Sequence, residues 1–127
     1  MGFLDKYSEQ AYALLRILSG LMFMAHGVQK LLSFPVPFPM PLNAMSTAAG
    51  CIEIAAGALI VIGFLTRPAA FIASGMCAVG YFMVHAPNGL YPIVNGGEQI
   101  AVYSLLFLYM ATKGAGIWSV EAATKKR

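Results

Sequence analysis

Five ionisable side chains could carry proton-transfer or ligand-binding chemistry in an otherwise apolar sequence. They are Glu53, His26, Lys30, His85 and Glu98, with the amide of Gln99 next to the last of them. Glu53 is the most informative, because it lies inside the apolar run 46–65. A charge there costs about 2.5–3.5 kcal/mol on insertion scales unless it has a partner, so such residues usually face the inside of a helix bundle and mark functional sites. An imidazole and a carboxylate can exchange a proton with a bound ligand, which makes His26 and Glu53 the candidate catalytic pair.

The composition is that of an integral membrane protein. Of the 127 residues, 59% are hydrophobic and only 10% are charged, whereas a soluble domain carries about 25% charged residues. A large soluble core does not explain the shortage of charged residues, because a short chain has too much surface to cover with water-exposed polar groups. Basic residues form no stripe outside the C-terminal run 125–127, which excludes nucleic-acid binding. The N-terminus lacks the features of a cleavable signal peptide, so we expect the first span to direct its own insertion.

Four apolar stretches predict four transmembrane helices. They cover about residues 11–32, 46–65, 68–86 and 98–113. Each is close to the roughly 17–25 residues that a bilayer requires, and the last is the shortest. The predicted fold is therefore all-α: a polytopic membrane protein, a four-transmembrane-helix bundle in which residues 1–127 form one domain.

The connections between these helices differ in character. The first, over 33–44, is rich in proline and apolar, and we expect it to lie in the membrane interface or to cover the polar residues. The second is a tight turn at residues 66–67, after which Pro68 suits the first turn of a helix. The third, over 87–97, contains Gly and Pro. Four glycines in the second and third spans should let helices approach closely. They are Gly50, Gly57, Gly75 and Gly80.

The basic residues predict the orientation. With a cytoplasmic N-terminus, seven of the eight lie at or near the inner face and only Lys30 lies outside. The seven are Lys6, Arg16, Arg67, Lys113, Lys125, Lys126 and Arg127. The positive-inside rule therefore predicts that both termini lie in the cytoplasm. Arg16 is close enough to the inner surface for its long side chain to extend there.

The helix spacing brings the polar residues together. Phe23, His26 and Lys30 share one face of the first span with Arg16. His26 lies about 9 Å from the outer end of its helix, and Glu53 about 10 Å below the same surface, at helical rise. We therefore expect both to be buried at the same depth. His85 ends the third span on this side and Glu98-Gln99 begins the fourth, so all four helices contribute to an outer-half cluster.

Several members of this cluster also have simpler interpretations. Glu98 could close a capping box with Asn95, and His85 could be an ordinary interfacial histidine. Lys30 could extend to the membrane surface. His26 and Glu53 could form a purely structural hydrogen bond.

Haem and metal sites are less favoured by the sequence. Two histidines could ligate haem, but His85 should lie nearer the surface than His26 and no C-x-x-C-H motif is present. The spacing of His and Glu is not diagnostic of a metal, so neither haem nor metal is predicted. Cys51 and Cys77 lie in different apolar runs, and we expect both to act as small buried hydrophobes rather than as a redox disulfide.

The sequence resembles the DoxX family of membrane proteins along almost its whole length. The matching segments are 16–20 (RILSG), 26–31 (HGVQKL), 49–53 (AGCIE), 63–67 (GFLTR), His85, 95–98 (NGGE) and 114–121 (GAGIWSVE). The resemblance implies a four-helix inner-membrane protein. Related proteins include the small membrane subunit associated with thiosulfate:quinone oxidoreductase and members linked to oxidative-stress and thiol redox complexes.

Two functions are compatible with these observations. The first is a quinone-interacting membrane subunit of an oxidoreductase, with quinone as the expected cofactor and a partner subunit to supply electrons, because the chain has no electron-carrying motif. His26 and Lys30 would then hydrogen-bond the quinone and Glu53 would exchange a proton, with His85, Glu98 and Gln99 completing the binding site. The alternative is a non-enzymatic scaffold or a small-solute binding or transport protein. The bilayer and further copies of the chain are the other partners expected.

Overall fold

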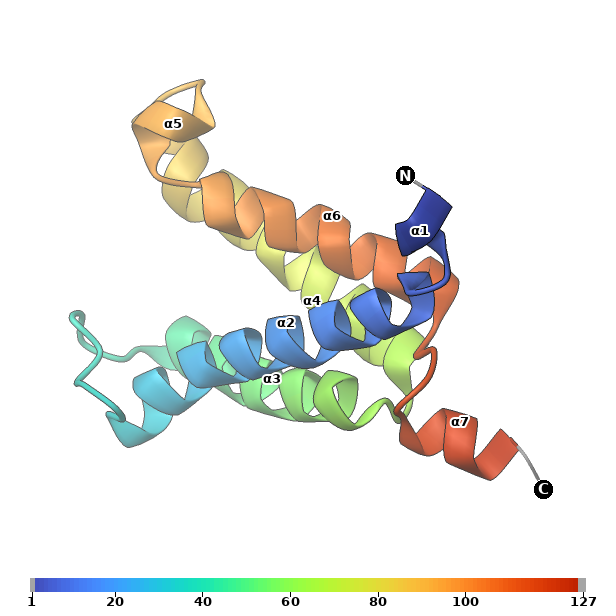
Figure 1. Cartoon of the computed structure of the whole chain (residues 1–127). Helices are drawn as coiled ribbons and strands as arrows, with labels where there is room; N and C mark the ends of the chain where they lie inside the picture. Colours follow the sequence, from blue (N-terminus) through green and yellow to red (C-terminus); the bar gives the residue numbers. More distant parts are fainter. Residues whose placement is uncertain (1, 126–127) are drawn as a thin grey trace.

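The chain folds into two helical hairpins. In the computed structural model, which describes residues 2–125, every regular element is a helix and no strand is present. One hairpin pairs α2 (Ser8–Leu32) with α3 (Ala44–Ile62), and the other pairs α4 (Thr66–Gly80) with α6 (Glu98–Lys113) (Figure 1). Lys126 and Arg127, which contribute to the predicted orientation, lie outside the described residues.

Shorter elements lie at the two ends of these hairpins. They are α1 (Gly2–Asp5), the π-helical turn η1 (Tyr81–His85), the 3-10 turn η2 (Ala86–Asn88), α5 (Pro92–Asn95) and α7 (Val120–Lys125). We call the end that carries segments 33–43 and 86–97 the loop end, and the opposite end, which carries both chain termini, the termini end (Figure 1). The two hairpins lie close together at the termini end and diverge toward the loop end (Figure 1).

Three helical stretches are long and apolar enough to cross a membrane, and they correspond to the first three of the four predicted spans. They are Ser8–Leu32, Ala44–Ile62 and Thr66–Asn88, the last combining α4, η1 and η2. The helix α6 matches the predicted range 98–113 and has 16 residues. At about 1.5 Å per residue it is about 24 Å long, shorter than a hydrocarbon core of about 30 Å. A fourth membrane crossing and the sidedness of the termini stay predictions.

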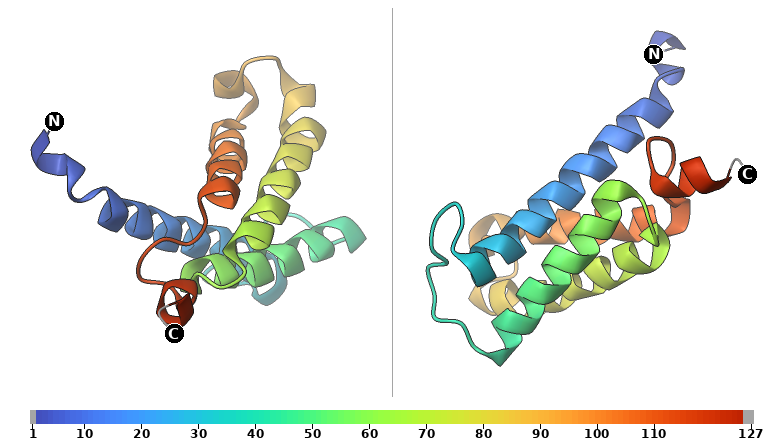
Figure 2. Two further views of the ribbon diagram at one scale, coloured as in Figure 1. Left: turned by 90° about the vertical axis from the view of Figure 1, so that its right-hand side faces the viewer. Right: turned by 90° about the horizontal axis from the view of Figure 1, so that it is seen from below.

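The turn between α3 and α4 lies earlier than predicted. Instead of residues 66–67, the turn comprises residues 63–65, whose first and last members have positive φ angles of 72° and 50°. Thr66 begins α4, and its backbone N–H donates to Oε2 of Glu121 at 2.8 Å. Glu121 belongs to α7, which lies beside this turn (Figure 2). Pro68 consequently falls in the first turn of α4, as predicted.

Glycines allow α2 and α3 to pack with their backbones close together. A Cβ atom added to Gly57 would lie only 2.9 Å from the carbonyl oxygen of Gly20. Gly50 and Gly80 face side chains of neighbouring helices at similarly short range, so the predicted close approach is confirmed at these positions. Gly75 is different, because an added Cβ meets no described atom within 4 Å. Its predicted packing role is wrong.

The sequence predicts that Arg16 extends to the membrane surface, and this is wrong. Arg16 is fully buried, and its guanidinium donates only to backbone carbonyl oxygens. They belong to Ile60 (3.0 Å), Val61 (3.4 Å), Ile117 (3.0 Å), Trp118 (2.7 Å) and Ala115. Two of these carbonyls end α3, where the helix leaves acceptors unsatisfied and the dipole favours a cation. Arg16 therefore ties the end of α3 to the segment that follows α6.

The core between the hairpins is aromatic. The ring centroid of Phe23 on α2 lies 5.0 Å from that of Phe107 and 6.4 Å from that of Tyr103, both on α6. Phe107 is completely buried, together with Ile60 and Met110. These contacts hold the two hairpins together, and they form the floor of the site described next.

Candidate functional site

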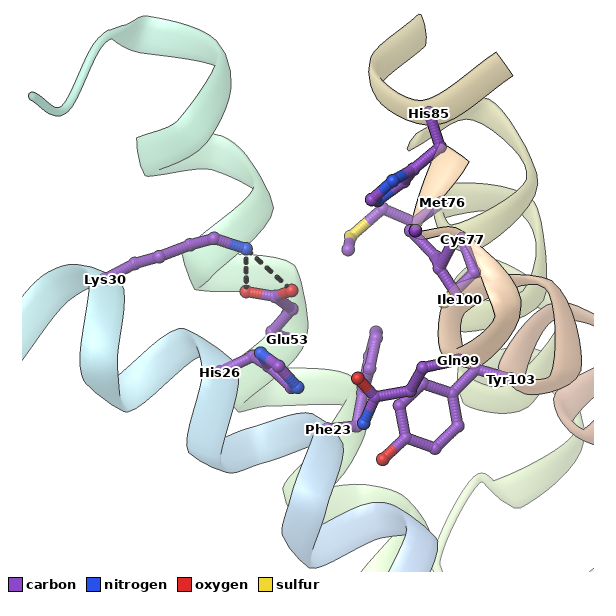
Figure 3. Close-up of a pocket in the computed structure, with 11 residues that line it drawn as sticks. Phe23, His26, Lys30, Glu53, Met76, Cys77, His85, Gln99, Ile100 and Tyr103 are labelled. Carbon is purple, nitrogen blue, oxygen red and sulfur yellow. Dashed lines mark hydrogen bonds and ion pairs between the residues drawn. The ribbon is translucent and has the colours of Figure 1, made fainter. Parts of the chain in front are cut away.

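A cavity of about 220 Å³ lies between the two hairpins, on the loop-end side of the aromatic core (Figure 3). We call it the interhelical cavity. Its polar lining comes from α2, α3, η1 and α6. The structure thus brings together five of the six residues singled out from the sequence. They are His26, Lys30, Glu53, His85 and Gln99.

The buried carboxylate of Glu53 is paired with Lys30. The Nζ atom of Lys30 lies 2.8 Å from each Glu53 carboxylate oxygen (Figure 3). The Glu53 side chain is 6% exposed and that of Lys30 is 17% exposed, so each charge offsets much of the cost of burying the other. Lys30 does not extend away to the surface, and the predicted pairing of Glu53 with His26 is wrong. No other ion pair occurs within residues 2–125.

His26 is exposed, although the sequence predicts burial. It lies one turn before Lys30 on α2, on the side of the molecule toward which the two hairpins diverge (Figure 1). The ring lines the interhelical cavity beside the Lys30–Glu53 pair (Figure 3). It also lines a second cavity of about 320 Å³, whose wall includes Pro35 and Val36 of the proline-rich segment.

The proline-rich segment covers part of the polar cluster. Pro35 and Val36 border the second cavity together with His26 and Gln99, and the ammonium of Lys30 lies 5.8 Å from the ring centroid of Phe38. The segment therefore approaches the polar residues from the loop end. This agrees with the expected covering role.

His85 is held by a π-helical turn and by the loop that follows. The backbone N–H of Ala86 donates to the carbonyl oxygen of Tyr81, a spacing wider than that of an α-helix. The Nδ1 atom of His85 lies 3.1 Å from the carbonyl oxygen of Asn95. A carbonyl only accepts, so Nδ1 carries a proton and is the donor in this contact. Asn95 is itself buried and donates to the hydroxyl of Tyr81 at 3.1 Å.

Glu98 is the predicted site residue that does not line the cavity. It is exposed at the start of α6, where its charge complements the helix dipole. The capping box with Asn95 is also wrong: Gly97 is the N-cap residue, and the Asn95 side chain accepts from the Gly97 N–H at 2.8 Å. Gln99, one position further along the helix, turns toward the cavity instead (Figure 3).

Sequence reasoning missed most of the apolar lining. Besides Phe23, which was placed on the correct face of its helix, the cavity is lined by Met76, Cys77, Ile100 and Tyr103. Tyr103 follows Gln99 by four residues, and this helical spacing was the available signal.

The two cysteines have different environments. Cys77 is buried, as expected, whereas Cys51 is exposed, so the expectation of burial is wrong for Cys51. Neither forms a disulfide in the described part of the chain. Within residues 2–125, no group of three or more His, Cys, Asp or Glu side chains is arranged to hold a metal ion.

Comparison with known proteins identifies the family. The DoxX family model matches residues 11–86, more than half of the chain. The chain belongs to the DoxX family. The DoxX match covers α2 from residue 11 onward together with α3, α4 and η1, and so includes His26, Lys30, Glu53 and His85.

One relative extends the similarity to α6. An uncharacterized protein of Haemophilus influenzae is 41% identical to this DoxX protein over 128 residues, which cover 95% of this chain and 96% of the relative. No solved structure matches the chain. The comparisons therefore establish a DoxX membrane-type protein.

Proposed function

We propose that this DoxX protein is a quinone-interacting membrane subunit of an oxidoreductase, and that the interhelical cavity receives the quinone ring. The observation that carries the proposal is the make-up of the cavity wall. An ion pair and two histidines lie on the same surface as aromatic and thioether side chains. A quinone ring needs hydrogen-bond donors at its carbonyl edge and apolar groups against its face.

The polar residues have distinct roles in this proposal. The Lys30 ammonium has three N–H groups, and the bonds to the two Glu53 oxygens leave one for a ligand carbonyl. His26 is exposed at the same wall and can donate a second hydrogen bond. Glu53 fixes the position of Lys30, and its carboxylate can accept a proton and pass it on to the bound ligand. Bound quinone would supply the electron-accepting chemistry, and a partner subunit would supply the electrons.

The apolar groups complete the fit. Phe23 closes the floor of the cavity, while Met76 and Ile100 lie on the α4–α6 side (Figure 3). The second cavity opens beside His26 and is bordered by Met22, Ala25 and the proline-rich segment. This neighbouring surface suits the isoprenoid tail of a membrane quinone.

The proposal includes the arrangement in the membrane. The helix α6 would be the fourth span, in an inner membrane with the loop end outside and both termini in the cytoplasm. The distribution of basic residues supports this orientation, because Lys30 is the one basic residue at the loop end within residues 2–125. The others are Lys6, Arg16, Arg67, Lys113 and Lys125 at the termini end.

Direct binding tests the proposal. The protein is placed in lipid nanodiscs and titrated with a short-chain benzoquinone by isothermal calorimetry. We expect saturable binding that weakens roughly tenfold or more in Lys30→Met, because a charged donor to the ligand is lost. Lys6→Met, a matched change at the exposed termini end, should bind like wild type. Absence of saturable binding to wild type would refute the proposal and favour a scaffold or a protein that binds a different small solute.

A further inference from the structure

The ring of His85 has one nitrogen bound to the protein and one left for the cavity. Its Nδ1 atom donates to the carbonyl oxygen of Asn95 at 3.1 Å. The half-buried side chain extends from η1 toward the Lys30–Glu53 pair and lines the interhelical cavity (Figure 3). The remaining ring nitrogen, Nε2, is therefore the one available to a ligand.

Asn95 holds this carbonyl oxygen in place through its own side chain. Asn95 is 6% exposed, and its amide nitrogen donates to the hydroxyl of Tyr81 at 3.1 Å and to the carbonyl oxygen of Gly89 at 3.0 Å. Its amide oxygen accepts from the backbone N–H of Gly97 at 2.8 Å. A satisfied network of buried polar groups is rigid. The segment between η1 and α6 therefore presents a fixed acceptor to Nδ1 of His85.

A proton fixed on Nδ1 makes the hydrogen bonding of Nε2 depend on the charge of the ring. In the neutral ring Nε2 accepts, and in the charged ring both nitrogens donate. A quinone carbonyl only accepts, so it can bond Nε2 only when His85 is charged, whereas a quinol hydroxyl can donate to the neutral ring. His26 lacks this restriction, because its ring is exposed and can adopt the neutral tautomer that donates to a ligand.

We propose that Asn95 is a positioning residue, and that the orientation it gives His85 lets the site distinguish oxidised from reduced quinone. Lys30 bonds one oxygen of the ligand, and Nε2 of His85 bonds the other. Quinone then binds best to the charged ring, while quinol also binds well to the neutral ring. This inference rests on the proposed function and deepens it, because it links the oxidation state of the ligand to one proton on His85.

The other ionisable groups around the cavity do not produce the same pH dependence. They are Lys30 and His26 from α2, Glu53 from α3, Cys77 from α4 and Tyr103 from α6, with Tyr81 on η1 itself. Lys30 and Glu53 compensate each other's charge, and a thiol or a phenol is ordinarily uncharged at neutral pH. Histidine is the side chain that ordinarily changes charge between about pH 5 and 8. The chain has two histidines, which makes His26 the matched comparison.

Calorimetric titrations in nanodiscs at several pH values test the proposal. The ligands are a short-chain benzoquinone with a fully substituted ring, which does not add thiols, and its quinol under argon. From about pH 5 to 8, the affinity of wild type for quinone should fall roughly tenfold or more, the effect of losing one hydrogen bond, and its affinity for quinol should change much less. His85→Gln has an amide that donates at every pH, so it should bind quinone without this fall. His26→Gln should retain the fall.

Two asparagines of the same segment test the positioning role. Asn95→Ala removes the side-chain bonds that hold the acceptor for Nδ1. A neutral His85 can then carry its proton on Nε2 and donate to quinone, so the pH dependence should shrink while binding persists. Asn88→Ala is the control, because Asn88 is exposed and bonds only the carbonyl oxygen of Val84, at 3.0 Å. It should behave like wild type.

Nuclear magnetic resonance of protein with ¹⁵N-labelled histidine gives a readout that a purely structural role would not affect. The nitrogen shifts of a neutral ring report which nitrogen carries the proton. Without ligand, neutral His85 should carry it on Nδ1 in wild type and in Asn88→Ala, and a mixture of both tautomers should appear in Asn95→Ala.

The outcomes separate the two proposals. If wild type binds no quinone, the proposed function fails and the inference about His85 and Asn95 fails with it. If wild type binds quinone with an affinity that does not fall as the pH rises, or if His26→Gln rather than His85→Gln abolishes the fall, only the inference is overturned. If Asn95→Ala does not fold, the wild-type spectrum decides, because a neutral His85 with its proton on Nε2 would overturn the role of Asn95.

Discussion

The Lys30–Glu53 pair predicts a strongly non-additive response to mutation. Both side chains are largely buried, and the Nζ atom contacts both carboxylate oxygens at 2.8 Å. Removing one partner of a buried pair leaves an uncompensated charge and costs about 3–5 kcal/mol. Because Lys30 keeps some exposure to water, we expect values near the lower limit, about 3 kcal/mol each for Lys30→Met and Glu53→Leu. Independent effects would sum to about 6 kcal/mol in the double variant.

The double variant should instead be close to wild type. Lys30→Met together with Glu53→Leu replaces a desolvated ion pair by apolar side chains of similar size, which is often neutral or stabilising. We expect its free energy of unfolding to lie within about 1 kcal/mol of wild type. The measurement is unfolding by SDS in mixed micelles, followed by circular dichroism, with Lys6→Met as the exposed control.

Two results would refute this reasoning. A double variant as unstable as the sum of the single variants would show that the residues contribute independently. A single Lys30→Met variant as stable as wild type would show that the contact carries no stabilisation. The double variant also separates folding from function, because it should fold but lose the Lys30 donor that the proposed quinone site requires.

Three further predictions concern the framework of the fold. Arg16→Met should lower the free energy of unfolding by about 3 kcal/mol or more in the same SDS assay, because it leaves several buried carbonyls unpaired. A variant as stable as wild type would contradict the buried role of Arg16. Gly57→Leu should lower the free energy of unfolding by about 1–3 kcal/mol, because the larger side chain overpacks the contact between α2 and α3. Gly75 faces open space, so Gly75→Leu should leave the stability unchanged. Equal effects of the two substitutions would refute the assigned helix contact. In a cysteine-free background, Leu90→Cys should react with an impermeant maleimide in intact cells and Thr124→Cys should not; the reverse pattern would invert the proposed topology.

The helices and their rough convergence could be predicted from the sequence. Long apolar runs determine where helices lie, and alternating direction places the end of α2, the middle of α3 and the start of α6 on one side. That reasoning gives depth along a helix axis. It gives rotation about the axis less well, which is why Glu98 was included in the site although the neighbouring Gln99 faces the cavity.

The partners of the charged residues could not be predicted. Glu53 was assigned to His26 because their depths match, yet a one-turn shift along α2 makes Lys30 the partner. The acceptors of Arg16 include carbonyls of residues 115–118, about 100 positions further along the chain in an irregular segment. Sequence periodicity does not describe such a segment. The exposure of His26 depends on how the hairpins diverge, which is a property of tertiary packing.

The central claim is that the interhelical cavity binds quinone, and the most direct measurement uses protein from its native membrane. Wild type, the Lys30→Met/Glu53→Leu variant and a Glu9→Gln control are purified in mild detergent, and their solvent extracts are analysed by mass spectrometry. We expect near-stoichiometric quinone in wild type and in the control, and little in the double variant. No quinone in wild type, or equal amounts in all three proteins, would contradict binding of quinone in the interhelical cavity.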